Sequence, residues 1–583
     1  MPRRLLFVDT ETHDGSGEMG SGEQFLRLGA ACFWQRPGSK QPERLERWPF
    51  NDARIFWSRL DRYAVPGKRL VIFAHGAQFD LQVLGGLEAM RAAGWVLMRR
   101  PILDKGRVIV HAQKAGATIL ILDSYNFLRG TLEELGEDLG FPKAPKPPRG
   151  AAASAWLTYC ERDVEVTRRA IGAYLELIET LQLGHFGATL PAQAMHGFRH
   201  RFMTHKIAVH SDPVGIELER AAYFGGRCEA WQLGLLAGHF VDLDMNAAYL
   251  AAMATGEFPL ALRYTCEPRD LRGLLKRLDG ALAVAEVRIV TSEPRYPKRL
   301  PSGRLAFPVG DFRTTLATPE LRVAIEKGAI AEVGRMAVYA SAPLFVDFAE
   351  ELWRVRSELM EMGAKFHARI LKDLGVTLYG KFGERKVTWS HQGDEPELPD
   401  EILEVLDADT GRKSTYRRLG GRLELREQDE ETDNSFPAIA AHVSSANRVR
   451  LYELAETAGI AETLYLDTDG LTTTRAGAER LIGLVDPKAL GGLKIVRETD
   501  DLEIRGPKDL RFGDLRMTKG RKRNARDLGD GRFEQEEFLG IEAALRAGHH
   551  GGPLIRTVAK RNPSPTILGS VTPSGRVLPI RLA

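Results

Sequence analysis

The stretch Tyr465-Leu466-Asp467-Thr468-Asp469-Gly470 places two carboxylates two residues apart inside an otherwise apolar run. Residues 464–466 are typical of a buried strand, and residues 471–474 are typical of its return. The Asp-Thr-Asp-Gly between them has turn chemistry, which predicts a tight hairpin. Carboxylates presented by a buried sheet need a neutralising partner, and oxygen ligands favour Mg²⁺ or Mn²⁺. The alternative is an ordinary surface turn, so the interpretation depends on acids elsewhere in the chain.

In the N-terminal third, two apolar runs each lead into acidic residues. Leu5–Val8 is followed by Asp9 and Glu11, which occupy alternate strand positions and therefore point to one face. A second apolar run, residues 70–74, leads to Asp80. Both runs predict buried strands that deliver carboxylates to a common edge.

A helix expected over Trp156–Ala170 carries Tyr159 and Asp163 at positions i and i+4, on one helix face. Tyr159 is positioned to hold an attacking water. The carboxylates that could meet around two metal ions are Asp9, Glu11, Asp80 and Asp163. Asp123, which follows another apolar run, is interpreted as a strand-end turn residue.

The middle of the chain contains Tyr223-Phe224-Gly225-Gly226-Arg227. Two glycines let the backbone approach a phosphate closely, and Arg227 adds positive charge. The alternative is a plain Gly-Gly turn. Residues 239–245 then alternate in polarity, which predicts a central strand that carries Asp244 and runs into a turn with Tyr249.

Trp353–Lys381 has helical character with a break near Gly363, which predicts a hairpin of two helices. Lys372 and Tyr379 lie seven residues apart and therefore share one face. Arg356 on the first helix could face the same groove. The alternative for these basic residues is a solvated helix surface.

Composition fits a large soluble protein rather than a secreted or membrane one. The 583 residues are 43% hydrophobic and 27% charged, with a net charge of +3 that leaves room for local basic surfaces. The four cysteines lack metal-ligand spacing and suit a reducing cytoplasm. Since no run of eighteen apolar residues exists, no membrane span is expected and the predicted location is cytoplasmic.

The N-terminal acids resemble the exonuclease motifs of family B DNA polymerases. Those motifs are Asp-x-Glu, Asn-x-x-(Phe/Tyr)-Asp and Tyr-x-x-x-Asp, and Gly76 stands where the family has Asn. Thr131-Leu132 resembles the (Ser/Thr)-Leu motif that contacts a single-stranded 3′ end, although Thr131 also fits a helix N-cap. A nuclease lysine is expected at Lys143 or Lys146.

The remaining motifs resemble the polymerase half of the same family. Asp244 to Tyr249 is a divergent copy of Asp-x-x-Ser-Leu-Tyr-Pro, and Lys372 to Tyr379 resembles Lys-x-x-x-Asn-Ser-x-Tyr. Val376 replaces the Asn of that motif, Gly470 replaces a Ser, and Leu510 replaces the Tyr of Lys-x-Tyr.

The resemblance implies a role for each matched residue. Asp244, Asp467 and Asp469 would form the polymerase site, with two Mg²⁺ or Mn²⁺ ions held by Asp244 and Asp469 and two more at the nuclease acids. Residues expected to bind the incoming nucleotide are Tyr249, Arg356, Lys372 and Tyr379. Residues expected to contact DNA are Tyr223, Gly225, Gly226, Arg227, Thr131, Leu132 and Lys508.

The expected fold is a multidomain mixture of α/β and α+β units, in which a ribonuclease-H-like 3′–5′ exonuclease precedes a right-hand polymerase. The small size resembles the protein-primed phage and plasmid subgroup, which implies a monomer that uses a DNA template, a primer strand, deoxynucleoside triphosphates and a terminal protein. The expected divisions are 1–185 exonuclease, 186–235 linker and template-binding segment, 236–345 palm with a first insertion, 346–385 fingers, 386–435 second insertion, 436–505 palm and 506–583 thumb.

Three alternatives stay open at this point. The polymerase half could be a degenerate DNA-binding platform beside a working exonuclease. Both sites could be inert in a scaffold that binds terminal protein. The enzyme could also extend ordinary primers, or start without one.

Overall fold

The computed structural model describes residues 1–14, 22–38, 42–104, 106–268, 270–561 and 567–583. Its N-terminal domain is built on a seven-stranded sheet in the order β3-β2-β1-β4-β7-β6-β5, in which β1, β4 and β7 are parallel. The strands are β1 Arg4–Asp14, β2 Gln24–Gln35, β3 Arg44–Phe50, β4 Arg69–Ala74, β5 Val96–Leu97, β6 Ile109–Lys114 and β7 Ala117–Asp123.

Side chains alternate along these strands and bury both faces of the sheet. Leu5 and Phe7 of β1 pack under the long helix α5, Ala153–Thr180, whereas Leu6 and Val8 pack against helices on the opposite face. The other helices of the domain are α1 Ala53–Leu60, α2 Ala77–Val83, α3 Gly86–Ala92, η1 Ser124–Asn126 and α4 Leu132–Asp138. The layered mixed sheet agrees with the α/β domain expected here.

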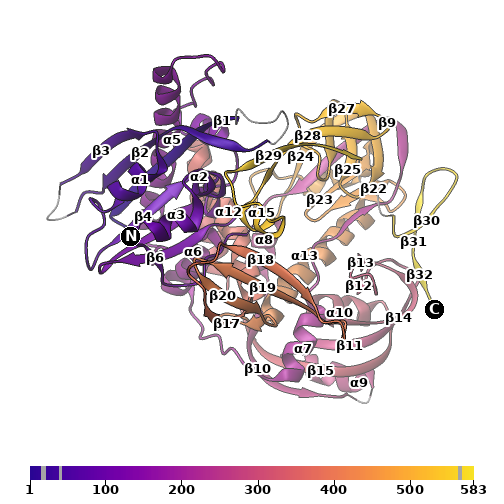
Figure 1. Ribbon diagram of the computed structural model, residues 1–583. Coiled ribbons are helices and arrows are strands. Elements are labelled where there is room, and N and C mark those ends of the chain that lie inside the picture. The colour runs from indigo at the N-terminus through magenta and orange to yellow at the C-terminus, as the bar shows by residue number, and fades with distance from the viewer. Residues whose placement is uncertain (15–21, 39–41, 105, 269, 562–566) are drawn as a thin grey trace.

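A second seven-stranded sheet, entirely antiparallel, lies in the part of the chain predicted to be the palm (Figure 1). Its order is β26-β25-β24-β9-β23-β22-β8. The strands are β8 Cys228–Ala230, β9 Gly234–Met245, β22 Thr463–Asp467, β23 Gly470–Thr474, β24 Leu493–Gly506, β25 Asp509–Phe512 and β26 Leu515–Thr518. The sheet therefore continues past residue 505, where the sequence suggested a boundary.

Helices cover one face of the palm sheet. Val241, Leu243 and Met245 of β9 pack against the buried helix α13, Pro437–Ala458, so Asp244 points to the opposite side. The helices around this sheet and its N-terminal link are α6 Leu190–Gly197, η2 Phe198–Phe202, α7 Pro213–Ala222, α8 Ala248–Thr255, α14 Arg475–Leu481 and η3 Ile482–Leu484.

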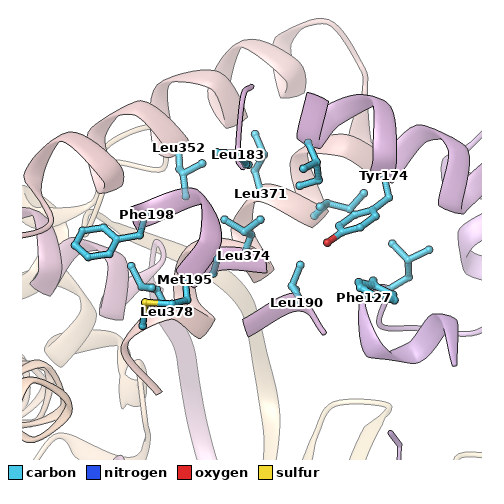
Figure 2. Packing of buried hydrophobic residues seen from close by; sticks show 14 of the residues in the cluster. Phe127, Tyr174, Leu183, Leu190, Met195, Phe198, Leu352, Leu371, Leu374 and Leu378 are labelled. Atoms are coloured by element: carbon cyan, nitrogen blue, oxygen red, sulfur yellow. The ribbon is translucent and has the colours of Figure 1, made fainter. Parts of the chain in front are cut away.

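The finger hairpin forms where it was predicted. It consists of α11 Val346–Glu361 and α12 Lys365–Phe382, and Gly363 lies between them with a φ of 75°. Figure 2 shows Leu371, Leu374 and Leu378 of α12 packed with Met195 and Phe198 of the link and with Tyr174 of α5 nearby. One continuous core thus joins the N-terminal domain to the fingers.

Both insertions are folded β-structures. The first contributes four strands to a five-stranded sheet, in which the C-terminal strand β32 is the fifth and pairs in parallel with β14. Its elements are β10 Phe258–Cys266, α9 Leu271–Leu278, β11 Leu282–Thr291, β12 Lys298–Arg299, β13 Leu305–Ala306, β14 Val309–Ala317, α10 Thr318–Glu326, β15 Ile330–Ala342 and β32 Arg581–Leu582. The second is mainly a four-stranded antiparallel sheet, with β16 Arg385–Lys386, β17 Trp389–Asp394, β18 Glu401–Leu406, β19 Lys413–Leu419, β20 Arg422–Arg426 and β21 Glu430–Glu431.

The C-terminal region, yellow in Figure 1, extends from the palm sheet to the N-terminal domain and returns to the first insertion. Its β29 reaches the N-terminal domain through a bridge between Leu554 and Glu23. Its elements are β27 Arg526–Gly529, β28 Arg532–Leu539, α15 Ile541–Arg546, β29 Leu554–Arg561, β30 Gly569–Val571 and β31 Val577–Pro579. No helix among the described residues is both long and apolar enough to cross a membrane.

Candidate active sites

The predicted hairpin is present, and its tip carries two of the three polymerase acids. Asp467 pairs with Gly470, so Thr468 and Asp469 form a two-residue turn in which Thr468 has a left-handed φ of 62°. A Cβ on Gly470 would lie 2.7 Å from the carbonyl oxygen of Leu243 on the neighbouring strand. This close approach explains why glycine occupies the position.

Strand β9 brings Asp244 to the same turn. Asp244 is the register partner of Gly470, and the backbone N–H of Met245 donates to the carbonyl of Asp469 over 2.8 Å. Burial and, to a smaller extent, the charges of Asp244 and Asp467 together raise the pKa of Asp469 to about 6. The hairpin and β9 thus bring three carboxylates together, although Asp244 is more than 200 residues away from Asp467 and Asp469 in the sequence.

Two lysines neutralise part of this cluster. Lys494 on β24 lies opposite Asp244 and places its Nζ 2.7 Å from the Asp244 carboxylate. Lys508 forms an ion pair with Asp467. Among the described residues, Asp469 has no such ion pair, and the charge of Lys372 lowers its pKa. A buried carboxylate with a raised pKa and room for a cation fits a divalent ion site.

The finger residues approach the cluster from α12. Tyr379 stacks on Tyr249 of α8 with ring centroids 4.6 Å apart and planes 18° apart. Lys372 lies near enough to lower the pKa of Asp469. The guanidinium of Arg356 packs 4.7 Å from the ring centre of Trp353 on its own helix, so its contact with a nucleotide stays a prediction.

The second acidic centre lies in the N-terminal domain and contains the four predicted carboxylates. Asp9 and Glu11 lie on β1, Asp80 lies in the first turn of α2, and Asp163 lies on α5. Burial raises the pKa of Asp9 strongly, and the charges of Asp80, Asp163 and Glu11 raise it further. This mutual effect shows that the carboxylates converge.

The acids of this centre are poorly neutralised by the protein itself. Burial, with Asp163 as the main neighbouring charge, raises the pKa of Glu11 to about 7, and burial raises the pKa of Asp80 to about 7. Asp80 accepts a 2.7 Å hydrogen bond from the Thr10 hydroxyl. Oδ1 of Asp163 is buried without a hydrogen-bond partner. Such an orphaned oxygen within an acid cluster fits a cation ligand.

Lys143 is the lysine of this centre. Its Nζ lies 2.6 Å from a carboxylate oxygen of Asp163 and 4.8 Å from the ring centre of Tyr159. The pairing raises the pKa of Lys143 above its ordinary value. Of the two lysines that the sequence left open, Lys143 contacts Asp163 and Tyr159, whereas Lys146 acts on Glu11 through its charge, and the role of either lysine in a nuclease stays a prediction.

Comparisons with known proteins agree with this arrangement. The family model described as DNA polymerase type B, organellar and viral, matches residues 147–448, just over half of the chain. The chain belongs to this family of DNA polymerases. It is therefore a DNA-directed DNA polymerase that carries out template-directed synthesis, and enzymes of this family use divalent metal ions.

Solved structures show the same fold. The chain is similar to Phi29 DNA polymerase in its ternary complex with primer-template DNA and incoming nucleotides, with a TM-score of 0.67 and 14% identity over 96% of this chain and 100% of that chain. It is also similar to Phi29 DNA polymerase complexed with single-stranded DNA, with a TM-score of 0.66 and 15% identity over 96% of this chain and 100% of that chain. No curated protein matches the sequence.

The polymerase differs from the sequence prediction at Arg227. Its side chain is fully buried among the rings of Trp231, Phe307 and Tyr452 and pairs with Glu229 at 2.5 Å. A contact between this guanidinium and DNA is therefore not compatible with the structure. Its backbone instead contacts the turn that carries Asp467 and Asp469, because the carbonyl of Arg227 accepts a 2.6 Å hydrogen bond from the N–H of Thr468.

The Gly-Gly segment is held against the catalytic turn by a residue that the sequence did not reveal. Arg448 of α13 is buried, donates to the carbonyls of Phe224 and Gly225 at 2.9 and 3.0 Å, and pairs with Glu320 at 2.8 Å. A Cβ on Gly226 would lie 2.7 Å from the Thr468 side chain. Arg448 is thus a positioning residue for the polymerase turn.

The cleft at Asp9 and Asp80 has a volume of about 800 Å³ and an aromatic lining that the sequence did not predict. The ring centres of His75 and Tyr125 lie 4.3 Å apart with their planes tilted by 32°, and the ring centres of Phe79 and of Phe538 from the C-terminal region lie 5.6 Å apart. The residues that line the cleft do not include Thr131 or Leu132. Tyr125 instead occupies the wall beside Gly76, whose φ is 88°.

Thr131 and Asp123 have the structural roles that the sequence also allowed. Thr131 caps α4 in a capping box with Glu134, and Leu132 is buried. The carboxylate of Asp123 accepts hydrogen bonds from the backbone N–H groups of Gly76 and Ala77 at 3.0 and 2.9 Å. Asp123 therefore shapes the loop that precedes Asp80.

We predict that Mg²⁺ stabilises the polymerase more at high pH than at low pH. The pKa values of Glu11, Asp80 and Asp469 are higher in the folded state than in the unfolded chain, so the metal-free fold loses stability as the pH rises from about 4 to about 7. A divalent ion offsets the repulsion among these carboxylates, which are deprotonated at high pH. Melting curves with Mg²⁺ or EDTA should show a larger Mg²⁺-induced rise in Tm at about pH 8 than at about pH 6. An equal or reversed effect contradicts this explanation.

We also predict that Lys494→Met lowers the Mg²⁺ concentration needed for half-maximal primer extension. The ammonium of Lys494 competes with a metal ion for Asp244. Because a partly exposed ion pair of this kind contributes little free energy, its removal should change the affinity for Mg²⁺ by about two- to fivefold. A Mg²⁺ titration of extension rates measures the effect. Lys488→Met, at an exposed lysine on a nearby loop, is the control. A higher Mg²⁺ requirement in Lys494→Met would mean that Lys494 assists the reaction instead.

Proposed function

We propose that the enzyme adds deoxynucleotides at a site held by Asp244 and Asp469 and removes frayed 3′ nucleotides at the N-terminal acids. The observation that carries this proposal is the convergence of acids into two centres, on β9 with the hairpin and on β1, α2 and α5. The separate centres provide for strand synthesis and strand trimming within one chain.

At the polymerase centre, two Mg²⁺ ions would supply charge neutralisation of the triphosphate and activation of the primer 3′-hydroxyl. Mn²⁺ fits the same oxygen ligands. Asp244 and Asp469 would hold the ions, with Asp467 acting through its neighbours. Because phosphoryl transfer needs little covalent help from the protein, these residues contribute position and charge.

The residues around the polymerase centre would bind the substrates. Lys372 lies where its ammonium can contact a triphosphate beside Asp469. The stacked rings of Tyr249 and Tyr379 form a floor for the nascent base pair, and Tyr249 would exclude a 2′-hydroxyl by sterics. Lys508 would contact the primer terminus. Phi29 DNA polymerase, which shares the fold, has been solved with primer-template DNA and incoming nucleotides.

At the nuclease centre, Tyr159 and Lys143 would position water for attack on the terminal phosphodiester. Lys143 lies between Tyr159 and Asp163, so its charge holds both groups in place. The aromatic walls of the cleft suit unstacked bases of a single strand. Since fraying is least costly at a mismatch, the enzyme would trim mismatched ends preferentially.

We further propose that synthesis begins on a terminal protein. The first insertion forms the folded sheet expected for a docking element, and it exposes Tyr264, Leu271 and Leu275. The proposed division of the chain keeps the palm, fingers, thumb and two insertions in the order given above. The host of the enzyme would be a bacterial cell that carries a phage or plasmid.

A labelled primer-template with one 3′ mismatch tests the two activities together. With Mg²⁺ alone, the enzyme should remove the mismatched nucleotide first; after nucleotides are added, it should extend the corrected primer. Product on a linear template without any added primer or protein would contradict protein priming, and trimming without extension would contradict an active polymerase half.

A further inference from the structure

Cys160 lies inside the nuclease centre, although no role for it was predicted from the sequence. It follows Tyr159 on α5 and is fully buried. Its Sγ lies 3.4 Å from Oδ2 of Asp9 and 3.3 Å from the Asp9 carbonyl oxygen. One possible ligand atom each from Asp9, Glu11 and Cys160 lie within 4.8 Å of one another.

A second observation at this place points to a ligand. Asp163 is 2% exposed, and its Oδ1 is buried without a hydrogen-bond partner. Asp163 follows Cys160 by three residues on α5, so the two side chains share a helix face. Its charge also raises the pKa values of Asp9 and Glu11, which places the carboxylate at the same centre.

We propose that this centre binds Zn²⁺ or a similar thiophilic ion through the Cys160 thiolate and the carboxylates of Asp9 and Glu11, in competition with Mg²⁺. Ligand atoms around a tetrahedral Zn²⁺ lie about 3.5 Å apart, so small side-chain rotations would close the site. Thiolate ligands favour Zn²⁺ over Mg²⁺, which binds oxygen. Binding exchanges the thiol proton for the ion, and the proton leaves to solvent.

The proposal gives the nuclease centre a metal preference that the polymerase centre lacks. Cys228 on β8 lies beside Asp467 in the sheet, but among the described residues it does not form a group of three possible ligand atoms within 4.8 Å of one another with the polymerase acids. Zn²⁺ would therefore occupy and inhibit the trimming centre at concentrations that leave synthesis active. The biological meaning rests on the proposed nuclease function, whereas ion binding can be measured without any turnover.

Cobalt spectroscopy tests the binding directly. Co²⁺ is added to the full-length, tag-free, metal-free enzyme, and the near-ultraviolet charge-transfer absorption of a Co²⁺–thiolate bond is recorded. The wild type should develop this band, Zn²⁺ should abolish it, and Cys160→Ser should lack it. Cys32→Ser is the matched control, because Cys32 is also free and buried in the same domain, and it should keep the band.

A second variant keeps the test decisive if Cys160→Ser folds poorly. Glu11→Gln retains the thiol but removes a carboxylate charge, and it should weaken Co²⁺ binding by at least about tenfold. A wild type without the band, or a band that persists in Cys160→Ser, overturns the proposal. In that case Cys160 is only a buried donor to Asp9. If the wild type showed the band but did not degrade 3′ ends, the proposed nuclease function would be wrong and the ion-binding proposal would stand.

Discussion

Asp469→Asn is expected to reduce primer extension by about a thousandfold or more and to leave 3′ degradation nearly unchanged. The substitution keeps the shape of the turn but removes the carboxylate charge that lies beside Asp244 and near Lys372. Rates of single-nucleotide addition and of single-strand degradation, measured on one preparation, give both values.

The control for this variant is Asp514→Asn, at an exposed acid in the turn between β25 and β26 of the same sheet. It should retain both activities. If Asp469→Asn still extended primers at a rate close to that of the wild type, the carboxylate would not be part of the polymerase centre. If it also lost degradation, the two centres would not be separate.

Asp9→Ala is expected to have the opposite effect, with degradation reduced by about a thousandfold and extension retained. Asp9 is the carboxylate whose pKa responds to all three other acids of the nuclease centre, so its loss removes the centre of the cluster. Degradation of a labelled single strand and extension of a matched primer measure the two effects.

Asp14→Ala is the matched control for Asp9→Ala, because Asp14 ends the same strand but is exposed. The Asp9 variant should also accumulate mismatched ends that the wild type removes. Retention of full degradation by Asp9→Ala would place the hydrolytic centre elsewhere.

The architecture explains how one chain can keep the two centres in a fixed relation. The core in Figure 2 runs from Phe127 and Tyr174 of the nuclease domain, through the link, to the finger helix α12. Arg369 of α12 also pairs with Asp138 of α4 at 2.9 Å. Buried apolar contacts over such a continuous surface favour a rigid unit. We therefore expect the primer end to move from one centre to the other while the domains keep their relative positions.

The sequence was sufficient for features that local chemistry determines. Asp-Thr-Asp-Gly predicted the hairpin, because few other arrangements suit those turn residues between two apolar runs. Acids at the ends of buried strands predicted the nuclease centre, since strand alternation decides which side chains share a face. Gly363 predicted the break between the finger helices.

The features that the sequence missed depend on register or on distant partners. Lys494 reaches Asp244 only because β24 pairs with β9 in one particular register. Arg227 was expected to bind DNA, but it is buried by rings that include Phe307, eighty residues away. In strands β17 and β18 of the second insertion, only Trp389 and Ile402 are buried and most other side chains are exposed, so the burial pattern was too weak to reveal a sheet.

Idling turnover by a mixture of the two variants tests most directly whether two separate centres exist. On a primer-template with only the next correct nucleotide present, the wild type should repeatedly add and remove that nucleotide and release its monophosphate. Neither Asp469→Asn nor Asp9→Ala alone should do so, whereas the two mixed together should restore monophosphate release as the DNA exchanges between molecules. A mixture that stays inactive, or a single variant that sustains turnover, would contradict two independent acidic centres.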